Sequence, residues 1–579
     1  MSCRESNDAD LNEAVLDTVE YHNPVVTGFH PDPSVVCVDG IFYMATSTFQ
    51  YFPGIPIYAS TNLREWQLIG HAINRTEQLS LFYAHSRLIH LENGNKMIAT
   101  GGLQAPTIRH HKGTFYVVGS NMVRRDGVMS REQFIVSTQD IWHGDWSDPI
   151  TFDFHGFDTS IFVDDDERVY IQGAWATDRR KQPHTLIHQL ELDLETGQIL
   201  SPSRLIWGGH SNFDTEGPHI YKKDGWYYLV AAEGGTFEHH MLTIARARDI
   251  WGPFQTYEQN PILTADGEDA FIQGLGHGEL FQDSDGAWWA IALGFRSLDG
   301  VWPIGREPFL SKVEWPEGGW PAIQQPSMTF VAKRVSEVAQ MPSVEAVSEL
   351  IHLRGRERSS YQIPNPHGLG TIRLLPTCCT IDSLRGLPTF VGKRQQELSA
   401  TARVTLDLDL VLRSADHVQA GLAVYLDPVR YVSLTYNFTT STVIFKLLLP
   451  GTQTYKETSY AIDPQDATML QFKVEAHPTF YSFFYALQHG PDGNEGAWLE
   501  AGTATTRDLF VRFFTGPVFG IFAQSERAWG DGTVPWVTFR DFDVSSTAQR
   551  VLSGPRIRPK AVSTGVLAES GFHLTADSS

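Results

Sequence analysis

A short hairpin pattern recurs five times between residues 38 and 293, and it constrains the fold more than any other feature of the chain. The five copies are VDGIFYMATS, HKGTFYVVGS, DDERVYIQGA, KDGWYYLVAA and SDGAWWAIAL. In each, a tight turn precedes alternating aromatic and aliphatic residues, which is a strong local signal for a β-hairpin. The copies lie 54 to 73 residues apart, enough for a four-stranded sheet with loops. We therefore predict a five-bladed β-propeller over residues 21–335.

The sequence pattern changes after a charged stretch near residues 333–360. Strictly alternating segments, such as 399–410 and 431–436, then recur with turn residues between them. This pattern is typical of antiparallel sheets that pack face to face. We predict an all-β chain in which an antiparallel β-sandwich of the concanavalin-like jelly-roll type, at 360–546, follows the propeller. Residues 547–579 are expected to form a C-terminal tail.

Composition excludes several classes of function. The net charge of −22 lacks the basic footprint of a nucleic-acid-binding protein. No run of 18 apolar residues exists, so no membrane span is expected. The polar first 20 residues have no apolar signal-peptide core, which favours the cytoplasm. The four cysteines (Cys3, Cys37, Cys378 and Cys379) have neither disulfide-framework nor metal-ligand spacing.

The repeat aligns the blades without any other sequence. Counting back eight residues from the first hairpin turn, and nine from each later one, gives Asp32, Gln104, Asp158, Glu216 and His277. Because the first strand of each propeller blade lies innermost, we expect these side chains to converge on one end of the central axis. Three carboxylates that face one another repel, which raises the pKa of at least one. One acid then stays protonated while another is ionised, as acid–base catalysis requires.

Each of these residues also has a purely structural interpretation. A lone aspartate at a strand entry often serves a turn, and His277 alone would fit a hydrogen-bonded core histidine. The shared register of three acids favours a site instead, in which His277 orients a catalytic acid or binds a cation. Gln104 either hydrogen-bonds a hydroxyl group or simply packs, and its sequence context leaves this open.

Six motifs stand in one order along most of the chain: NPVVTGFHPDPS, STFQYFPGIPIYAS, GFDTSIFVDDD, TEGPHIYKKDGWYYLVAAEGG, GLGHGEL and IGREPFL. Together they resemble glycoside hydrolase family 43, in particular its two-domain β-xylosidases and α-L-arabinofuranosidases. The resemblance implies an inverting glycosidase in which Asp32 is the general base and Glu216 the general acid. Asp158 would tune the pKa of that acid. Inversion requires base and acid on opposite faces of the sugar, roughly 6.5–9.5 Å apart, so that water fits between.

The resemblance also implies residues that bind substrate. Arg306 would hold sugar hydroxyls with its rigid fork, Phe49 would form an aromatic wall, and His240 would line the pocket. A surface salt bridge and an ordinary core position are the alternatives for Arg306 and Phe49. Phe514 of the second domain would close the pocket, which favours removal of terminal sugars. Many relatives have Trp where this chain has Gln104, which puts the preferred linkage in doubt.

The sequence therefore predicts an exo-acting β-xylosidase that releases xylose from the non-reducing end of β-1,4-xylo-oligosaccharides, with α-L-arabinofuranosidase as a side activity. A dedicated α-L-arabinofuranosidase acting on arabinoxylan side chains is the enzymatic alternative. A non-catalytic sugar-binding propeller is the alternative from another class, and loss of a carboxylate would favour it. The resemblance implies no required metal or cofactor, and it leaves open an axial calcium near His277. The sequence also leaves open whether the chain forms a homo-oligomer.

Overall fold

The computed structural model describes residues 17–90, 96–177, 182–337, 340–343, 345–368, 370–408, 417–449, 456–463, 468–488, 496–509, 511–526 and 535–546. The expected tail at 547–579 and Cys3 lie outside these residues. Within them the helices are the short turns η1 (Arg358–Ser360) and α3 (Thr506–Leu509). No helix in the described part of the chain is long and apolar enough to cross a membrane. The prediction of an all-β chain is confirmed.

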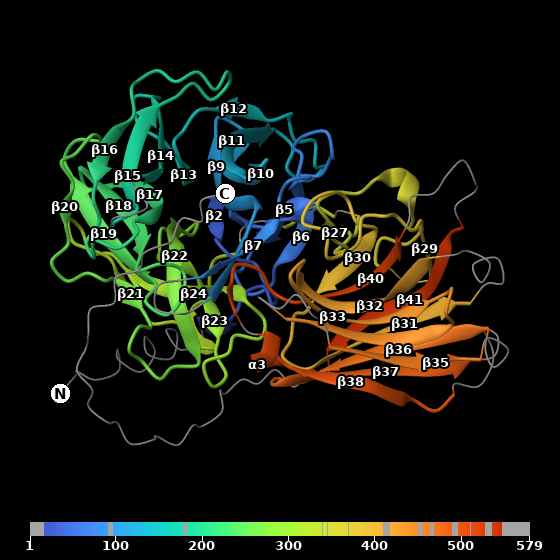
Figure 1. Cartoon of the computed structure of the whole chain (residues 1–579). Helices are drawn as coiled ribbons and strands as arrows, with labels where there is room; N and C mark the ends of the chain where they lie inside the picture. Colours follow the sequence, from blue (N-terminus) through green and yellow to red (C-terminus); the bar gives the residue numbers. More distant parts are fainter. Residues whose placement is uncertain are drawn as a thin grey trace, which may run out of the picture.

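Antiparallel sheets follow one another along the first half of the described chain, and each begins with one of the five predicted hairpins (Figure 1). The first sheet contains β2 (Ser34–Val38), β3 (Ile41–Ala45), β5 (Gly54–Ser60) and β6 (Gln67–Ile73). The second contains β9 (Gly102–His111), β10 (Thr114–Arg125), β11 (Val128–Thr138) and β12 (Ile150–Phe152).

Three more sheets continue this series. The third contains β13 (Gly156–Val163), β14 (Val169–Ala176), β15 (Thr185–Glu191) and β16 (Arg204–Trp207). The fourth contains β17 (Glu216–Lys223), β18 (Trp226–Glu233), β19 (Met241–Ala247), β20 (Gln255–Thr256) and β21 (Leu263–Thr264). The fifth contains β22 (Ile272–Gln282), β23 (Trp288–Arg296), β24 (Arg306–Glu314) and β25 (Ala322–Ile323).

The contacts between these sheets follow a closed order. Apolar clusters join the first sheet to the second, the second to the third, the third to the fourth and the fourth to the fifth. Another cluster joins the fifth sheet back to the first, through residues such as Phe42 and Trp289. The first strands, β2, β9, β13, β17 and β22, also contact one another in this order. Residues at the entry of these strands therefore face a common centre.

The second half of the described chain forms two facing sheets, drawn in colours from yellow to red in Figure 1. One runs β28 (Tyr361–Gln362), β29 (Thr371–Leu374), β41 (Val537–Ser546), β31 (Ala400–Asp407), β36 (Met469–Ala476), β37 (Phe480–Gln488) and β38 (Leu499–Thr505). The other runs β30 (Phe390–Arg394), β40 (Val518–Ser525), β32 (Val418–Asp427), β33 (Arg430–Asn437), β34 (Thr442–Leu448) and β35 (Lys456–Ala461). One apolar cluster contains residues of both sheets, including Val404 and Leu422.

Three small ladders connect distant parts of the chain. The pair β1 (Thr18–His22) and β26 (Thr329–Lys333) joins the two ends of the first half. The second joins the two halves through β4 (Tyr51–Phe52) and β27 (His352–Leu353). The third comprises β7 (Ser86–His90), β8 (Lys96–Thr100) and, parallel to β8, β39 (Arg512–Phe513). The last ladder holds the segment that follows β39 against the first domain.

Candidate active site

Each first strand, or the residues just before it, contains a left-handed residue close to the centre of the ring of sheets. In the second to fifth sheets a β-bulge interrupts the ladder to the second strand at this point. Bulges re-aim side chains next to a site. The left-handed residues are Asp32 (φ 56°), Ala105 (φ 45°), Asp158 (φ 52°), Gly217 (φ 54°) and His277 (φ 36°). The same left-handed backbone conformation thus recurs in all five sheets, and the side chain at that position differs between them.

The predicted register is wrong by one residue in the second and fourth sheets. Ala105 and Gly217, rather than Gln104 and Glu216, occupy the position equivalent to Asp32. The third and fifth hairpins have longer loops than the tight turns of the other three, so a fixed count back from the turn is not uniform. Gln104 and Glu216 still stand beside the bulge, one residue earlier.

Asp32 is buried, and three groups hold its carboxylate. Oδ1 lies 3.2 Å from Nη1 of Arg306 and 3.9 Å from Nδ1 of His277. The hydroxyl of Ser47 donates a hydrogen bond to Oδ2 at 2.5 Å. Burial raises the pKa of Asp32, but Arg306, His277 and Ser47 together outweigh it and lower the pKa below its ordinary value. Asp32 is therefore ionised at neutral pH, as a general base must be.

The other two carboxyl groups shift in the opposite direction. Burial, reinforced by the negative charge of Asp32, raises the pKa of Asp158 to about 6 despite the nearby His277 ring. Burial and then the charge of Asp158 raise the pKa of Glu216 well above its ordinary value. Nδ1 of His277 lies 3.7 Å from Asp158 as well as near Asp32, so it bridges two of the three acids. The pKa values of the expected base and the expected acid are thus shifted in opposite directions, as acid–base catalysis requires.

Gly217 allows the backbone that follows Glu216 to pass close to the ring of His277. A Cβ atom on Gly217 would lie 3.1 Å from the imidazole ring, closer than most real contacts, and its positive φ also favours glycine. The backbone N–H of Gly217 further bonds the Asp158 carboxylate. This glycine therefore brings Glu216, Asp158 and His277 together.

Arg306 links the acid cluster to the second domain. The whole residue is only 4% exposed, so the surface salt-bridge interpretation is wrong. Nη1 contacts Asp32 and donates to the hydroxyl of Thr236 at 3.0 Å. Nε and Nη2 both donate to the backbone carbonyl of Phe514 at 3.1 Å. The guanidinium of one domain is thus oriented by a backbone group of the other.

Aromatic rings from both domains stack beside Arg306. Phe49 stacks on Phe514 with ring centroids 5.9 Å apart, and Phe514 stacks on Phe237 at 6.2 Å. Phe237 in turn stacks on Trp302 at 5.9 Å. The Arg306 guanidinium lies 5.4 Å from the centroid of Phe49 and 5.2 Å from that of Phe514. Sequence reasoning missed Phe237 and Trp302, because both lie in loops outside the hairpin register.

His240 and Gln104 lie at the margin of this cluster. His240 is fully buried, its Nδ1 lies 3.1 Å from the carbonyl of Gly274, and burial lowers its pKa to about 3. His240 therefore has no surface exposed to solvent, and it packs against the backbone of β22. Gln104 donates from Nε2 to the carbonyl of Thr100 at 2.8 Å.

Ser47 is a further residue that sequence reasoning missed. Its hydroxyl accepts a hydrogen bond from the backbone N–H of Ala105 at 2.7 Å and donates to Asp32. The bulge of the second sheet therefore orients a serine of the first sheet toward the expected base. The quoted stretch VDGIFYMATS ends on this serine, but only its contact across the sheets gives it a role.

An axial calcium near His277 stays an expectation, and the carboxylates closest to this histidine are Asp32 and Asp158. Calcium prefers six to eight oxygen ligands. The nearby carboxylate of Glu279 is instead bound to Arg109 at 2.5 Å, and Arg109 also lies 3.2 Å from His219. No group of three or more His, Cys, Asp or Glu side chains in the described ranges could hold a metal ion.

A closed series of sheets with buried carboxyl groups of opposed pKa shifts near its centre is the arrangement expected of a glycoside hydrolase, and the comparisons show that class. The model for Glycosyl hydrolases family 43 matches residues 21–321, and that for the Beta xylosidase C-terminal Concanavalin A-like domain matches 351–545. The chain belongs to glycosyl hydrolases family 43. The resemblance found in the sequence is confirmed.

Similar proteins carry two kinds of name. A Bacteroides ovatus protein named Non-reducing end alpha-L-arabinofuranosidase BoGH43B is 30% identical over 90% of this chain and 95% of its own. A Bacillus subtilis Beta-xylosidase is 27% identical over 87% and 96%. Xylosidase/arabinosidase 43B of Humicola insolens is 35% identical over 52% and 54%. The crystal structure of xylan beta-1,4-xylosidase from Bacillus halodurans C-125 covers 91% of this chain and 100% of its own, with TM-score 0.77 and 27% identity.

Proposed function

We propose that this hydrolase acts on chain ends and inverts configuration, releasing xylose from the non-reducing end of β-1,4-xylo-oligosaccharides, with α-L-arabinofuranosidase as a side activity. The observation that carries the mechanism is the opposed pKa shift of Asp32 and Glu216. The low pKa of Asp32 suits a base, and the raised pKa of Glu216 suits an acid.

The reaction follows from these protonation states. Asp32 accepts a proton from water as the water oxygen bonds to the anomeric carbon. Glu216 gives its proton to the glycosidic oxygen as the bond between that oxygen and the anomeric carbon breaks. Because water attacks from the face opposite the leaving group, the anomeric configuration inverts. Asp32 ends protonated and Glu216 ionised, and proton exchange with solvent restores both.

Asp158 and Arg306 prepare the two reacting acids. The negative charge of Asp158 helps to keep Glu216 protonated, and the positive charge of Arg306 keeps Asp32 ionised. Removing either group would narrow the pKa difference between acid and base. In this proposal Arg306 also binds sugar hydroxyls, beside the wall formed by Phe49 and Phe514.

Closure of the site by the second domain supports action on chain ends. Phe514 stacks on Phe49 and Phe237, and its carbonyl binds Arg306, so the sandwich forms part of the pocket wall. A wall at this point favours a terminal sugar over an internal one. His240 and His277 would support the acid cluster from β22 and its neighbourhood.

We also infer the finer architecture. The closed order of apolar clusters and of first-strand contacts supports a five-bladed propeller at 21–335. The two facing sheets support a separate sandwich domain at 360–546.

The choice between xylose and arabinose depends on Gln104 and its surroundings. Relatives named Beta-xylosidase and Non-reducing end alpha-L-arabinofuranosidase support both substrates. A dedicated α-L-arabinofuranosidase is the second candidate. A non-catalytic propeller is disfavoured, because all three carboxyl groups are present and shifted as catalysis requires.

The test measures hydrolysis of aryl β-D-xyloside beside aryl α-L-arabinofuranoside. We expect the wild type to cleave the xyloside faster, Glu216→Ala to lose most of both activities, and the control Glu258→Ala, at an exposed residue, to retain them. Cleavage of the arabinofuranoside alone would support the second candidate. Cleavage of neither substrate, or survival of both activities in Glu216→Ala, would refute the proposal.

A further inference from the structure

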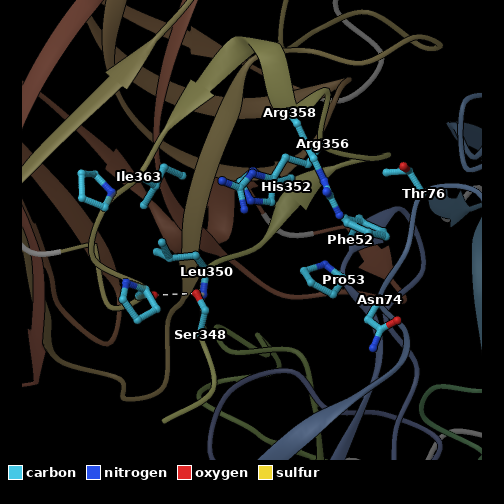
Figure 2. A pocket seen from close by; sticks show the side chains of 12 residues that line it. Phe52, Pro53, Asn74, Thr76, Ser348, Leu350, His352, Arg356, Arg358 and Ile363 are labelled. Carbon is cyan, nitrogen blue, oxygen red and sulfur yellow. Dashed lines mark hydrogen bonds between the residues drawn. The ribbon is translucent and has the colours of Figure 1, made fainter. Parts of the chain in front are cut away.

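A second cavity lies between the two domains, beside the ladder of β4 and β27 and apart from the acid cluster. Its volume is about 360 Å³, within the range of small-molecule sites. Figure 2 shows that its lining comes from both halves of the chain. The first domain supplies Phe52, Pro53, Asn74 and Thr76, and the rest comes from residues 348–366.

The charged side chains that line this cavity are all positive. Arg356 and Arg358 both line it, and no aspartate or glutamate does. Among the described residues neither arginine forms an ion pair with a carboxylate. The ring of Tyr361 lies 5.7 Å from the Arg356 guanidinium, and the exposed Glu77 lies near Arg358. Two guanidinium groups at one cavity are unexpected in a chain of net charge −22. The cavity therefore attracts an anion.

Two buried polar atoms of the lining lack a partner among the described residues. They are Nε of Arg356, which donates, and Oδ1 of Asn74, which accepts. Buried polar atoms are seldom left without a hydrogen bond, and each exception calls for an explanation. Because both atoms are fully buried, a ligand with an anionic acceptor and a hydroxyl donor satisfies them only if the Arg356 and Asn74 side chains turn toward the cavity as it binds.

The remaining lining suits the body of a sugar. Phe52, Pro53, Ile363 and Pro364 supply apolar surface, while Thr76 and Ser348 add hydroxyl groups. The hydroxyl of Ser348 donates to the carbonyl of Pro366, as the dashed line in Figure 2 marks. Sugars present both C–H faces and hydroxyl edges, so one ligand would match both kinds of surface.

We propose that this interdomain cavity binds a sugar that carries one anionic group, either a carboxylate or a phosphate. The anion lies between Arg356 and Arg358, and a ring hydroxyl donates to Asn74. Because the lining comes from the first domain, from the segment that connects the two domains and from the start of the sandwich, an occupant holds these parts together and stabilises the folded chain. The proposal does not depend on the proposed hydrolytic activity.

Titration calorimetry on the full chain tests this site with four probes: glucuronic acid, glucose 6-phosphate, neutral glucose and inorganic phosphate. We expect at least one of the two sugar anions to bind, to bind more weakly as salt rises, and to raise Tm. Glucuronic acid and glucose 6-phosphate distinguish carboxylate from phosphate. If glucose or inorganic phosphate binds as tightly as both sugar anions, or if neither anion binds, the proposal is wrong.

Matched variants locate the binding. Arg356→Gln and Arg358→Gln should each weaken the anion about tenfold or more, whereas Arg373→Gln, at an exposed residue of the sandwich, should not. Thr76→Glu places a carboxylate at an exposed edge of the cavity without disturbing the core, and should abolish binding if the arginine variants fold poorly. Anion binding that survives Thr76→Glu would overturn the assignment.

Discussion

Nη1 of Arg306 lies 3.2 Å from Oδ1 of Asp32, and both side chains are buried. The same guanidinium binds the carbonyl of Phe514 in the second domain. The charge that keeps the expected base ionised is therefore held in place by the docked sandwich. Chemistry in the first domain thus depends on the position of the second.

Replacing Arg306 should move the acidic limb of the pH profile. Arg306 lowers the pKa of Asp32, so Arg306→Gln raises that pKa and shifts the acidic limb of kcat/KM to higher pH. Arg306→Lys keeps the charge and should shift the limb less, although it loses the paired bonds to Phe514. The pH profiles of kcat/KM for the wild type and both variants check this. If the acidic limb lies at the same pH in all three, the role of Arg306 is contradicted.

Ser47→Ala should lower kcat with little change in KM. The hydroxyl orients Asp32 and accepts the N–H of Ala105, and a hydrogen bond to a charged group contributes about 1.5–3 kcal/mol. We expect kcat to fall about 10- to 100-fold. Ser34→Ala is the control, because Ser34 is equally buried but bonds the N–H of Ile108 instead. Equal losses of kcat in both variants would rule out a positioning role for Ser47.

Asp158→Asn should stabilise the protein at neutral pH while reducing activity. The pKa of Asp158 is raised from 3.8 to about 6, so ionisation costs the folded state stability as pH rises through that window. Removing the charge should therefore raise the free energy of unfolding by up to about 3 kcal/mol above pH 6, and by nothing below pH 4.

Denaturant unfolding at several pH values measures this difference. Asp126→Asn is the control, since Asp126 has the same left-handed backbone (φ 50°) at an exposed turn. If Asp158→Asn raises the free energy of unfolding equally at every pH, the carboxyl charge is not the cause of the added stability.

Phe514→Ala should weaken substrate binding without unfolding the sandwich. The ring closes the aromatic wall between Phe49 and Phe237, so its loss opens the pocket to water. We expect kcat/KM for an aryl β-D-xyloside to fall at least about tenfold, with KM rising. Phe480→Ala, at an exposed ring of the same domain, should leave the kinetics unchanged. A similar fall in both variants would contradict the closing role.

Local features of the fold followed from the sequence. Turn residues and period-two alternation are short-range signals, so all five hairpins and several sandwich strands, such as β31 and β33, could be predicted. The register was accurate enough to bring Asp32, Asp158 and His277 to one point. It failed by one residue at Gln104 and Glu216, because the loop lengths of the hairpins differ.

Long-range contacts could not be predicted from those signals. Ser47 acquires its role from Ala105, more than fifty residues away, across two sheets. Phe237 and Trp302 stand in loops without periodicity, and their stacking depends on the docked Phe514. The burial of Arg306 likewise requires both domains. Nothing in the local sequence distinguishes these residues from ordinary turn or core positions.

The anomer released first tests the central claim most directly. Proton NMR of an aryl β-D-xyloside during the first minutes of hydrolysis distinguishes α- from β-xylose before mutarotation mixes them. If Asp32 activates water while Glu216 protonates the leaving oxygen, α-xylose appears first. Initial release of β-xylose would mean retention through a covalent intermediate, and would contradict the assignment of Asp32 as a general base.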